Sequence, residues 1–190
     1  MLAKALQERL EEPYFLFNWD SFVAEIIPKK FQTADSDGKV FYLKALSAMF
    51  QTIKLYSDLG LNAIVDHVFE KSFFESELKS LDECIEILHE YPVLFIHVTC
   101  PIQELRRREK ARGDRQIGQA ESQLSTLVPQ DTEIYDITID THEYSSRECT
   151  DKIIEMLGYP KKHKAFKTLW LQSSMVQKAA RQGCRALRTR

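Results

Sequence analysis

Short apolar runs alternate with amphipathic helical stretches along most of this 190-residue chain. The runs are apolar at nearly every position, which is typical of parallel strands covered by helices on both faces. Strand, helix and strand in succession predict right-handed crossovers within one parallel sheet. We therefore expect an α/β fold, a three-layer parallel sheet with helices on both faces, in one domain. The predicted strands lie at 14–19, 62–69, 93–98 and 133–141, and the main helices at 41–59, 74–90 and 145–157.

A cluster of cationic residues follows the third predicted strand. Six Lys and Arg side chains lie between Arg106 and Arg115, on a helical stretch that Gly113 is expected to end. Arg guanidinium groups suit phosphate oxygens because they bind two at once and stay charged at any working pH. Two interpretations stand: a mobile lid over nucleotide phosphates, or a solvated basic helix face with Glu109 as an internal counter-charge.

Two acids follow predicted strands at the edge where parallel sheets bind ligands. Asp20 could accept a proton from a substrate hydroxyl, or cap the helix that follows. Asp66 ends a run typical of strands whose acid orients Mg²⁺ or its water, but it could also bind a substrate hydroxyl or cap a turn. We interpret His67 and His97 as structural residues.

Other classes of site have little support. The four cysteines are scattered without a C-x-x-C pair, which argues against a zinc site or a disulfide framework and favours the cytoplasm. Residues 35–39 are expected to form a turn or exposed loop, and they lack the downstream acid of a calcium loop. The sequence contains no apolar run long enough to span a bilayer.

The charge is divided unevenly between the body and the C-terminal end. Nine of the 26 Lys and Arg residues follow Pro160, whereas all 28 acidic residues precede it, so the body carries a net charge of −11 and the tail +9. We expect a domain at 1–158 and a basic extension at 159–190, helical or disordered. Its apolar residues could form one helix face that binds a membrane surface, nucleic acid or a partner: Phe166, Leu169, Trp170, Met175 and Val176.

Taken together, several motifs resemble the chloramphenicol phosphotransferase family over about Leu2 to Leu157. They are Asp20-Ser21-Phe22, Ile64 to Phe69, Val98 to Pro101, Arg108-Glu109, Arg112 to Arg115, Gly118, Tyr135-Asp136, Asp140 to His142 and Ser146 to Cys149. The resemblance implies a P-loop kinase fold. It also implies transfer of the γ-phosphoryl group of ATP, with Mg²⁺, to a hydroxyl of a small molecule.

The resemblance also implies roles for individual residues. Asp20 would be the general base on the acceptor hydroxyl, and Asp66, with Phe69, would lie in the acceptor pocket or near Mg²⁺. Arg112 and Arg115 would stabilise the transferring phosphoryl group, and Arg108 would be a further phosphate ligand of the lid.

The sequence departs from the family in one respect. No G-x-x-x-x-G-K-[ST] motif occurs, and Leu2 to Leu6 matches the helix that follows this phosphate loop. We therefore expect a truncated domain that lacks the first, central strand, between the strands that end at Asp66 and Val98. Either those two strands pair directly, or the chain is a fragment.

Three functional hypotheses follow. The first is an ATP-dependent small-molecule O-phosphotransferase. The second is a catalytically inactive remnant that still binds a hydroxylated ligand near Asp20 and Asp66. The third is a protein that binds nucleic acid or anionic lipid through its basic tail, which added salt would weaken steeply.

Overall fold

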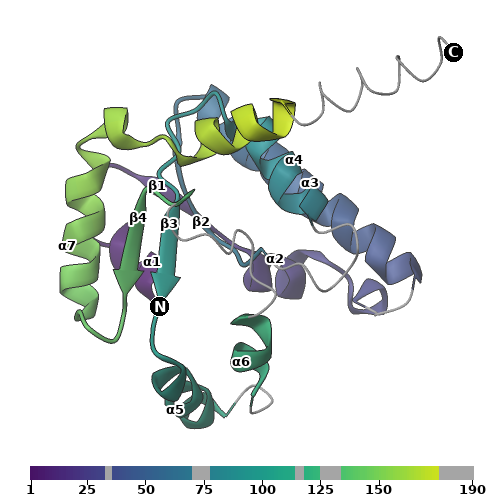
Figure 1. Ribbon diagram of the computed structural model, residues 1–190. Helices are drawn as coiled ribbons and strands as arrows, with labels where there is room; N and C mark the ends of the chain where they lie inside the picture. The colour runs from purple at the N-terminus through teal and green to yellow at the C-terminus, as the bar shows by residue number, and fades with distance from the viewer. Residues whose placement is uncertain (33–35, 70–77, 114–117, 125–133, 176–190) are drawn as a thin grey trace, which may run out of the picture.

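The computed structural model describes residues 1–32, 36–69, 78–113, 118–124 and 134–175. Strands and helices alternate along the described chain, as the sequence predicts (Figure 1). The elements are α1 (Leu2–Gln7), β1 (Tyr14–Asn18), α2 (Trp19–Ile26), η1 (Lys29–Phe31), α3 (Ser36–Asp58), β2 (Asn62–Asp66), α4 (Leu78–Leu88), β3 (Ile96–Thr99), α5 (Ile102–Arg112), α6 (Gln119–Leu124), β4 (Ile137–Asp140), α7 (Ser146–Leu157) and η3 (Pro160–Lys162). A further helix, here the C-terminal helix, covers residues 165–175.

The strands form two separate parallel pairs. β1 pairs with β2 in a register that runs from Tyr14 opposite Asn62 to Asn18 opposite Asp66. β3 pairs with β4, from Ile96 opposite Ile137 to Thr99 opposite Asp140. Among the described residues no backbone hydrogen bonds join β2 to β3, so the direct pairing of these two strands is not observed. The parallel α/β class is confirmed, and the missing central strand is consistent with this arrangement.

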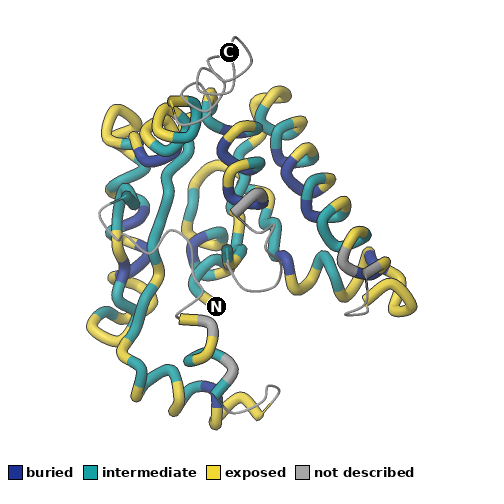
Figure 2. Tube along the Cα trace, turned by 45° about the vertical axis from the view of Figure 1, so that its right-hand side comes forward, coloured by how far each residue is buried: buried dark blue, intermediate teal, exposed yellow. Residues whose placement is uncertain are grey.

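Helices cover both faces of the strand pairs. On one face, Leu6 of α1 packs with Ile139 of β4 and with Cys149 and Ile153 of α7. On the other face, α3 and α4 form the larger core, in which Met49 and Phe50 are fully buried. Figure 2 shows that buried residues concentrate in this body, whereas the segment that holds α5 and α6 is mostly exposed or half-buried.

Local sequence signals account for several helix ends. Ser145 and Glu148 form a capping box at the start of α7, where each side chain accepts a hydrogen bond from the other residue's backbone N–H. Gly113 ends α5 in the left-handed conformation, with φ of 67°. The loop expected at 35–39 is wrong, because α3 begins at Ser36 and extends the predicted helix by more than one turn.

The C-terminal helix packs on the body. Phe166 is buried in the larger core with Leu169 and Trp170 beside it, so these three residues of the expected apolar face contact the core. Asp136 holds the start of this helix, since its Oδ1 accepts hydrogen bonds from the backbone N–H groups of Lys164 (2.7 Å) and Ala165 (3.0 Å). Its Oδ2 accepts from the N–H of Phe95 at 2.9 Å, which ties the helix to the chain that enters β3.

Within the described part of the chain, no helix is both long enough and apolar enough to cross a bilayer.

We predict that Asp136→Ala lowers the free energy of unfolding by about 2 kcal/mol, because three backbone N–H groups, two of them half-buried, lose a charged acceptor. Chemical denaturation would measure the change. Glu155→Ala is the control, because this acid is exposed near the end of α7 and its removal should change stability by less than about 0.5 kcal/mol. Equal effects of the two substitutions would contradict the anchoring role of Asp136.

Candidate functional site

Asn18 joins three elements at the carboxyl ends of β1 and β2. Its Oδ1 accepts a hydrogen bond from the backbone N–H of Ser21 at 2.9 Å and caps α2. Its Nδ2 donates to Oδ2 of Asp66 at 2.9 Å, across the register that sets the two residues side by side. The side chain of Asn18 thus fixes the position of the Asp66 carboxylate relative to the first turn of α2.

Asp20 lies in that first turn, and its side chain is exposed. The alternative role of Asp20 as the helix cap is wrong, because Asn18 provides the cap. An acid in the first turn is nevertheless favoured there, since the helix dipole places partial positive charge at its N-terminus. The structure thus leaves the carboxylate of Asp20 accessible at the carboxyl edge of the first strand pair, close in sequence to Asn18.

His67 and Phe69 follow Asp66 into the larger core. The ring of Phe69 lies 4.6 Å from that of His67 and 6.2 Å from that of Phe50, edge-on to the first and tilted against the second. Burial lowers the pKa of His67 to about 4, so its imidazole is neutral at pH 7. His67 is therefore a structural side chain among aromatic rings, and Phe69, expected in the acceptor pocket, packs partly on the core.

The Arg-rich stretch forms α5, and the chain turns back after Gly113 into α6 (Figure 1). In that view α5 and α6 lie beyond the ends to which the β3 and β4 arrows point, on the side of the molecule where α2 also lies. Arg112 is exposed in the last turn of α5. Arg115 lies outside the described residues.

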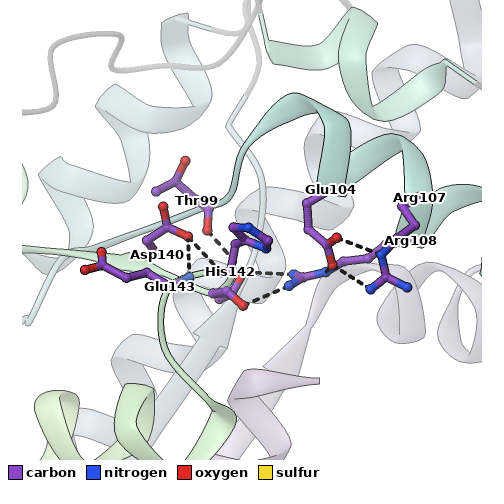
Figure 3. A network of polar contacts seen from close by, with 8 residues as sticks. Thr99, Glu104, Arg107, Arg108, Asp140, His142 and Glu143 are labelled. Atoms are coloured by element: carbon purple, nitrogen blue, oxygen red, sulfur yellow. Dashed lines mark hydrogen bonds and ion pairs between the residues drawn. The ribbon is translucent and has the colours of Figure 1, made fainter.

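Arg108 connects α5 to the end of β4 (Figure 3). Its Nη1 and Nη2 donate to the hydroxyl and the backbone carbonyl of Thr141, both at 2.8 Å, while its Nε donates to Glu104 at 2.7 Å. Thr141 in turn donates from its hydroxyl to the carbonyl of Thr99 at 3.1 Å. Arg107 and Arg108 together lower the pKa of Glu104 to about 2, so this acid stays charged. Arg108 therefore holds α5 against the ends of both strands of the second pair.

Glu109 organises the return of the chain. This carboxylate is buried and accepts hydrogen bonds from the N–H groups of Gly118 (2.6 Å) and Ala120 (2.9 Å) at the start of α6. Arg106 forms a bidentate ion pair with Glu121 of α6, with both contacts at 2.7 Å. Glu109 therefore does not lie on a solvated helix face, because the acid is buried and bonds to backbone N–H groups.

Sequence reasoning did not assign Asn18, Glu109 or Thr141 to the site. Asn18 carried a usable signal, since an Asn three residues before Ser21 at a strand-to-helix junction is a typical N-cap. Glu109 and Thr141 lie in motifs that carry the family resemblance, but their contacts could not be predicted, because their partners lie 9 and 33 residues away in the chain.

The described residues do not fit a complete site for ATP and Mg²⁺. The glycines with positive φ, Gly60, Gly113 and Gly118, precede β2, end α5 and precede α6, and none lies between a strand and the helix that follows it. No cluster of three His, Cys, Asp or Glu side chains suited to a metal ion occurs in the part of the chain that is described. The described residues therefore supply an acid-bearing strand edge and the Arg-bearing helix α5, and none of their positive-φ glycines forms a phosphate-binding loop.

Comparisons with known proteins agree with this geometry. A search of solved structures finds an unliganded sugar kinase from Janibacter sp. HTCC2649, with a TM-score of 0.54 and 16% sequence identity, covering 85% of this chain and 88% of that one. At this identity the likeness shows the fold alone, and it confirms the expected kinase-like architecture. Among curated proteins, none matches the chain.

The comparison of sequences assigns a family, whereas the structural likeness shows only the fold. Residues 1–158 match the family model of the chloramphenicol phosphotransferase-like proteins, a span that includes both strand pairs, Asn18, Asp66 and α5. This match confirms the resemblance seen in the motifs and supports a kinase-like or phosphotransferase-like function. The chain belongs to the chloramphenicol phosphotransferase-like protein family.

Proposed function

We propose that this chain is a small-molecule O-phosphotransferase domain that passes the γ-phosphoryl group of ATP to a hydroxyl. The observation that supports the proposal best is the linked set of Asn18, Asp66 and α2 at the carboxyl edge of the first strand pair. An accessible acid follows it at Asp20, and the Arg-bearing lid extends beyond the carboxyl edge of the second pair. Acids on one side and cations on the other suit transfer of a phosphate group to an alcohol.

In this proposal each side of the site has its own task. Asp20 accepts the proton of the acceptor hydroxyl, and Asp66 orients the acceptor while Asn18 holds its carboxylate in place. Arg112 and Arg115 neutralise charge on the transferring phosphoryl group, whereas Arg108 keeps the lid attached to β4. The phosphates of ATP need a cradle that the described residues do not supply, so turnover depends on groups from outside them.

A second candidate function is binding of a small molecule without catalysis. It is supported by the lack of a phosphate-binding cradle among the described residues. The acceptor side, with its fixed Asp66, could bind a hydroxylated small molecule without any phosphoryl transfer. Chloramphenicol is the first acceptor to test for both candidates, on the family description.

We predict that Asp20→Asn lowers phosphate transfer from ATP to chloramphenicol by about 10²- to 10⁴-fold, because the amide cannot accept the hydroxyl proton. Transfer of radiolabelled phosphate would measure it. Asp37→Asn is a matched control, since Asp37 is also an exposed acid in the first turn of a helix, away from the strand ends. Equal turnover of Asp20→Asn and wild type would remove Asp20 from the mechanism. Chloramphenicol binding without turnover in the wild type would favour the second candidate, and neither binding nor turnover would contradict both.

We predict that Asn18→Ser and Asn18→Ala weaken chloramphenicol binding alike, by about tenfold, because each removes the hydrogen bond to Asp66. Their stabilities should differ by about 1 kcal/mol, because Ser still caps α2 and Ala does not. Titration calorimetry and denaturation would separate the two effects. If Asn18→Ser binds chloramphenicol as well as the wild type and only Asn18→Ala binds it more weakly, Asn18 acts through the helix cap alone.

We predict that Glu109→Ala speeds amide hydrogen exchange at Gly118 and Ala120 by about tenfold or more, because both N–H groups lose their acceptor. Glu121→Ala is the control, since it removes the exposed ion pair to Arg106 and leaves these two N–H groups bonded. Unchanged exchange at both amides in Glu109→Ala would show that the lid turn holds without this carboxylate.

A further inference from the structure

A cleft lies between the end of α4 and the C-terminal helix, which lie side by side in Figure 1. Its volume is about 490 Å³, within the range of small-molecule sites. One wall is the chain between α4 and β3, at residues 89–93, and the other wall contains His163, Phe166, Lys167 and Trp170. The cleft therefore lies at the amino end of β3, opposite to the edge that carries Asp66, and its second wall follows the span 1–158 that matches the family.

Aromatic rings join the two walls. The imidazole of His89 stacks on the indole of Trp170, with ring centroids 4.2 Å apart and ring planes 4° from parallel. Glu86 of α4 fixes both rings, because its carboxylate accepts a hydrogen bond from Nε1 of Trp170 at 2.9 Å and its backbone carbonyl lies 2.9 Å from Nδ1 of His89. The hydroxyl of Tyr91 donates to Asp58 of α3. The aromatic walls are thus held in place by contacts within the chain.

The polar groups of the cleft that remain available carry opposite charges on opposite walls. Glu90 lies on the wall that follows α4, Lys167 lies on the C-terminal helix, and both residues are exposed. Neither forms an ion pair with another described residue. The ring of His163 uses Nε2 toward the carbonyl of Met156 at 3.0 Å, whereas its Nδ1 is buried and has no hydrogen-bond partner in the described chain. The cleft therefore offers a carboxylate, an ammonium group and an imidazole nitrogen to a ligand.

We propose that this cleft binds a small zwitterion with an aromatic ring, such as a free aromatic amino acid. The ring of the ligand packs against Tyr91, Phe166 and Trp170, where burial of apolar surface and contacts between rings stabilise the complex. The carboxylate of the ligand pairs with Lys167, and its ammonium group pairs with Glu90. A ligand with a single charge leaves one of these two side chains without a partner.

This site does not depend on the proposed function. None of the residues that line the cleft belongs to the set proposed for phosphoryl transfer, and the two sites lie at opposite ends of β3. Binding in the cleft can therefore be measured whether or not the chain transfers phosphate.

Tryptophan and two of its analogues test the proposal on the full chain. Indole-3-propionate lacks the ammonium group of tryptophan, and tryptamine lacks its carboxylate. Titration calorimetry should show binding of tryptophan with a Kd of about 1 mM or lower. Each analogue should bind about tenfold more weakly, because it loses one hydrogen bond between charged groups.

Two substitutions should each remove one preference. Lys167→Gln should bind tryptophan no better than tryptamine and keep the preference for tryptophan over indole-3-propionate. Glu90→Gln should do the reverse. Both side chains are exposed, so both variants should melt like the wild type. Lys161→Gln is the matched control, because this exposed lysine does not line the cleft, and it should keep both preferences.

The two tryptophans of the chain locate the bound ligand. In the ¹⁵N-labelled protein, unlabelled tryptophan should shift the indole N–H signal of Trp170, which lines the cleft. The signal of Trp19 is the internal control and should not move, because Trp19 is buried at the start of α2 and does not line the cleft.

Three outcomes would overturn the proposal. A shift of the Trp19 signal alone would place the ligand at the carboxyl edge of the first strand pair. Equal affinity for all three ligands would mean that the cleft does not recognise the two charges. Absence of saturable binding of tryptophan would mean that the cleft holds no ligand of this class.

Discussion

The fold depends on apolar packing that spans two strand pairs which do not hydrogen-bond to each other. Leu6 lies in a core with side chains from β2, β3 and β4 on one face. On the other face Phe50 lies in the larger core, which also contains Phe17 of β1, Ala63 of β2 and Phe95, just before β3. Burial of apolar surface is non-directional, so it can hold the pairs in one body without a continuous ladder. Backbone hydrogen bonding is directional, and it leaves the inner edges of β2 and β3 unused among the described strands.

The candidate site follows from this arrangement. The carboxyl ends of parallel strands lie on one side of a sheet, so the end of β2, at Asp66, and helix α5, which follows β3, lie on the same side of the body (Figure 1). Short polar contacts then fix each group: Asn18 holds Asp66, and Arg108 holds α5 against Thr141 (Figure 3). Asp66 and α5 are thus positioned by different strand pairs, and their relative placement depends on the packing between those pairs.

Prediction from the sequence succeeded where the determining contacts are local. The start of α7 next to Ser145 and the end of α5 at Gly113 depend on residues within one turn, and both helix ends were predicted. It failed at Ser36 to Lys39, where polar residues typical of a loop lie in the first turn of α3. It also failed at Glu109, because nothing within one turn of this acid indicates that its partners are backbone N–H groups of α6.

The sequence by itself determined the parallel α/β class, the family and the order of strands and helices, because period, caps and motifs are properties of neighbouring residues. It also determined that no Walker A motif occurs in this chain. Only the tertiary structure decided that β2 and β3 stay apart, that Asn18 serves both Asp66 and α2, and that Phe166 joins the core. Each of these features depends on groups that are distant in sequence and close in space. Whether such groups bury apolar surface or form backbone hydrogen bonds cannot be predicted from the pattern of neighbouring residues.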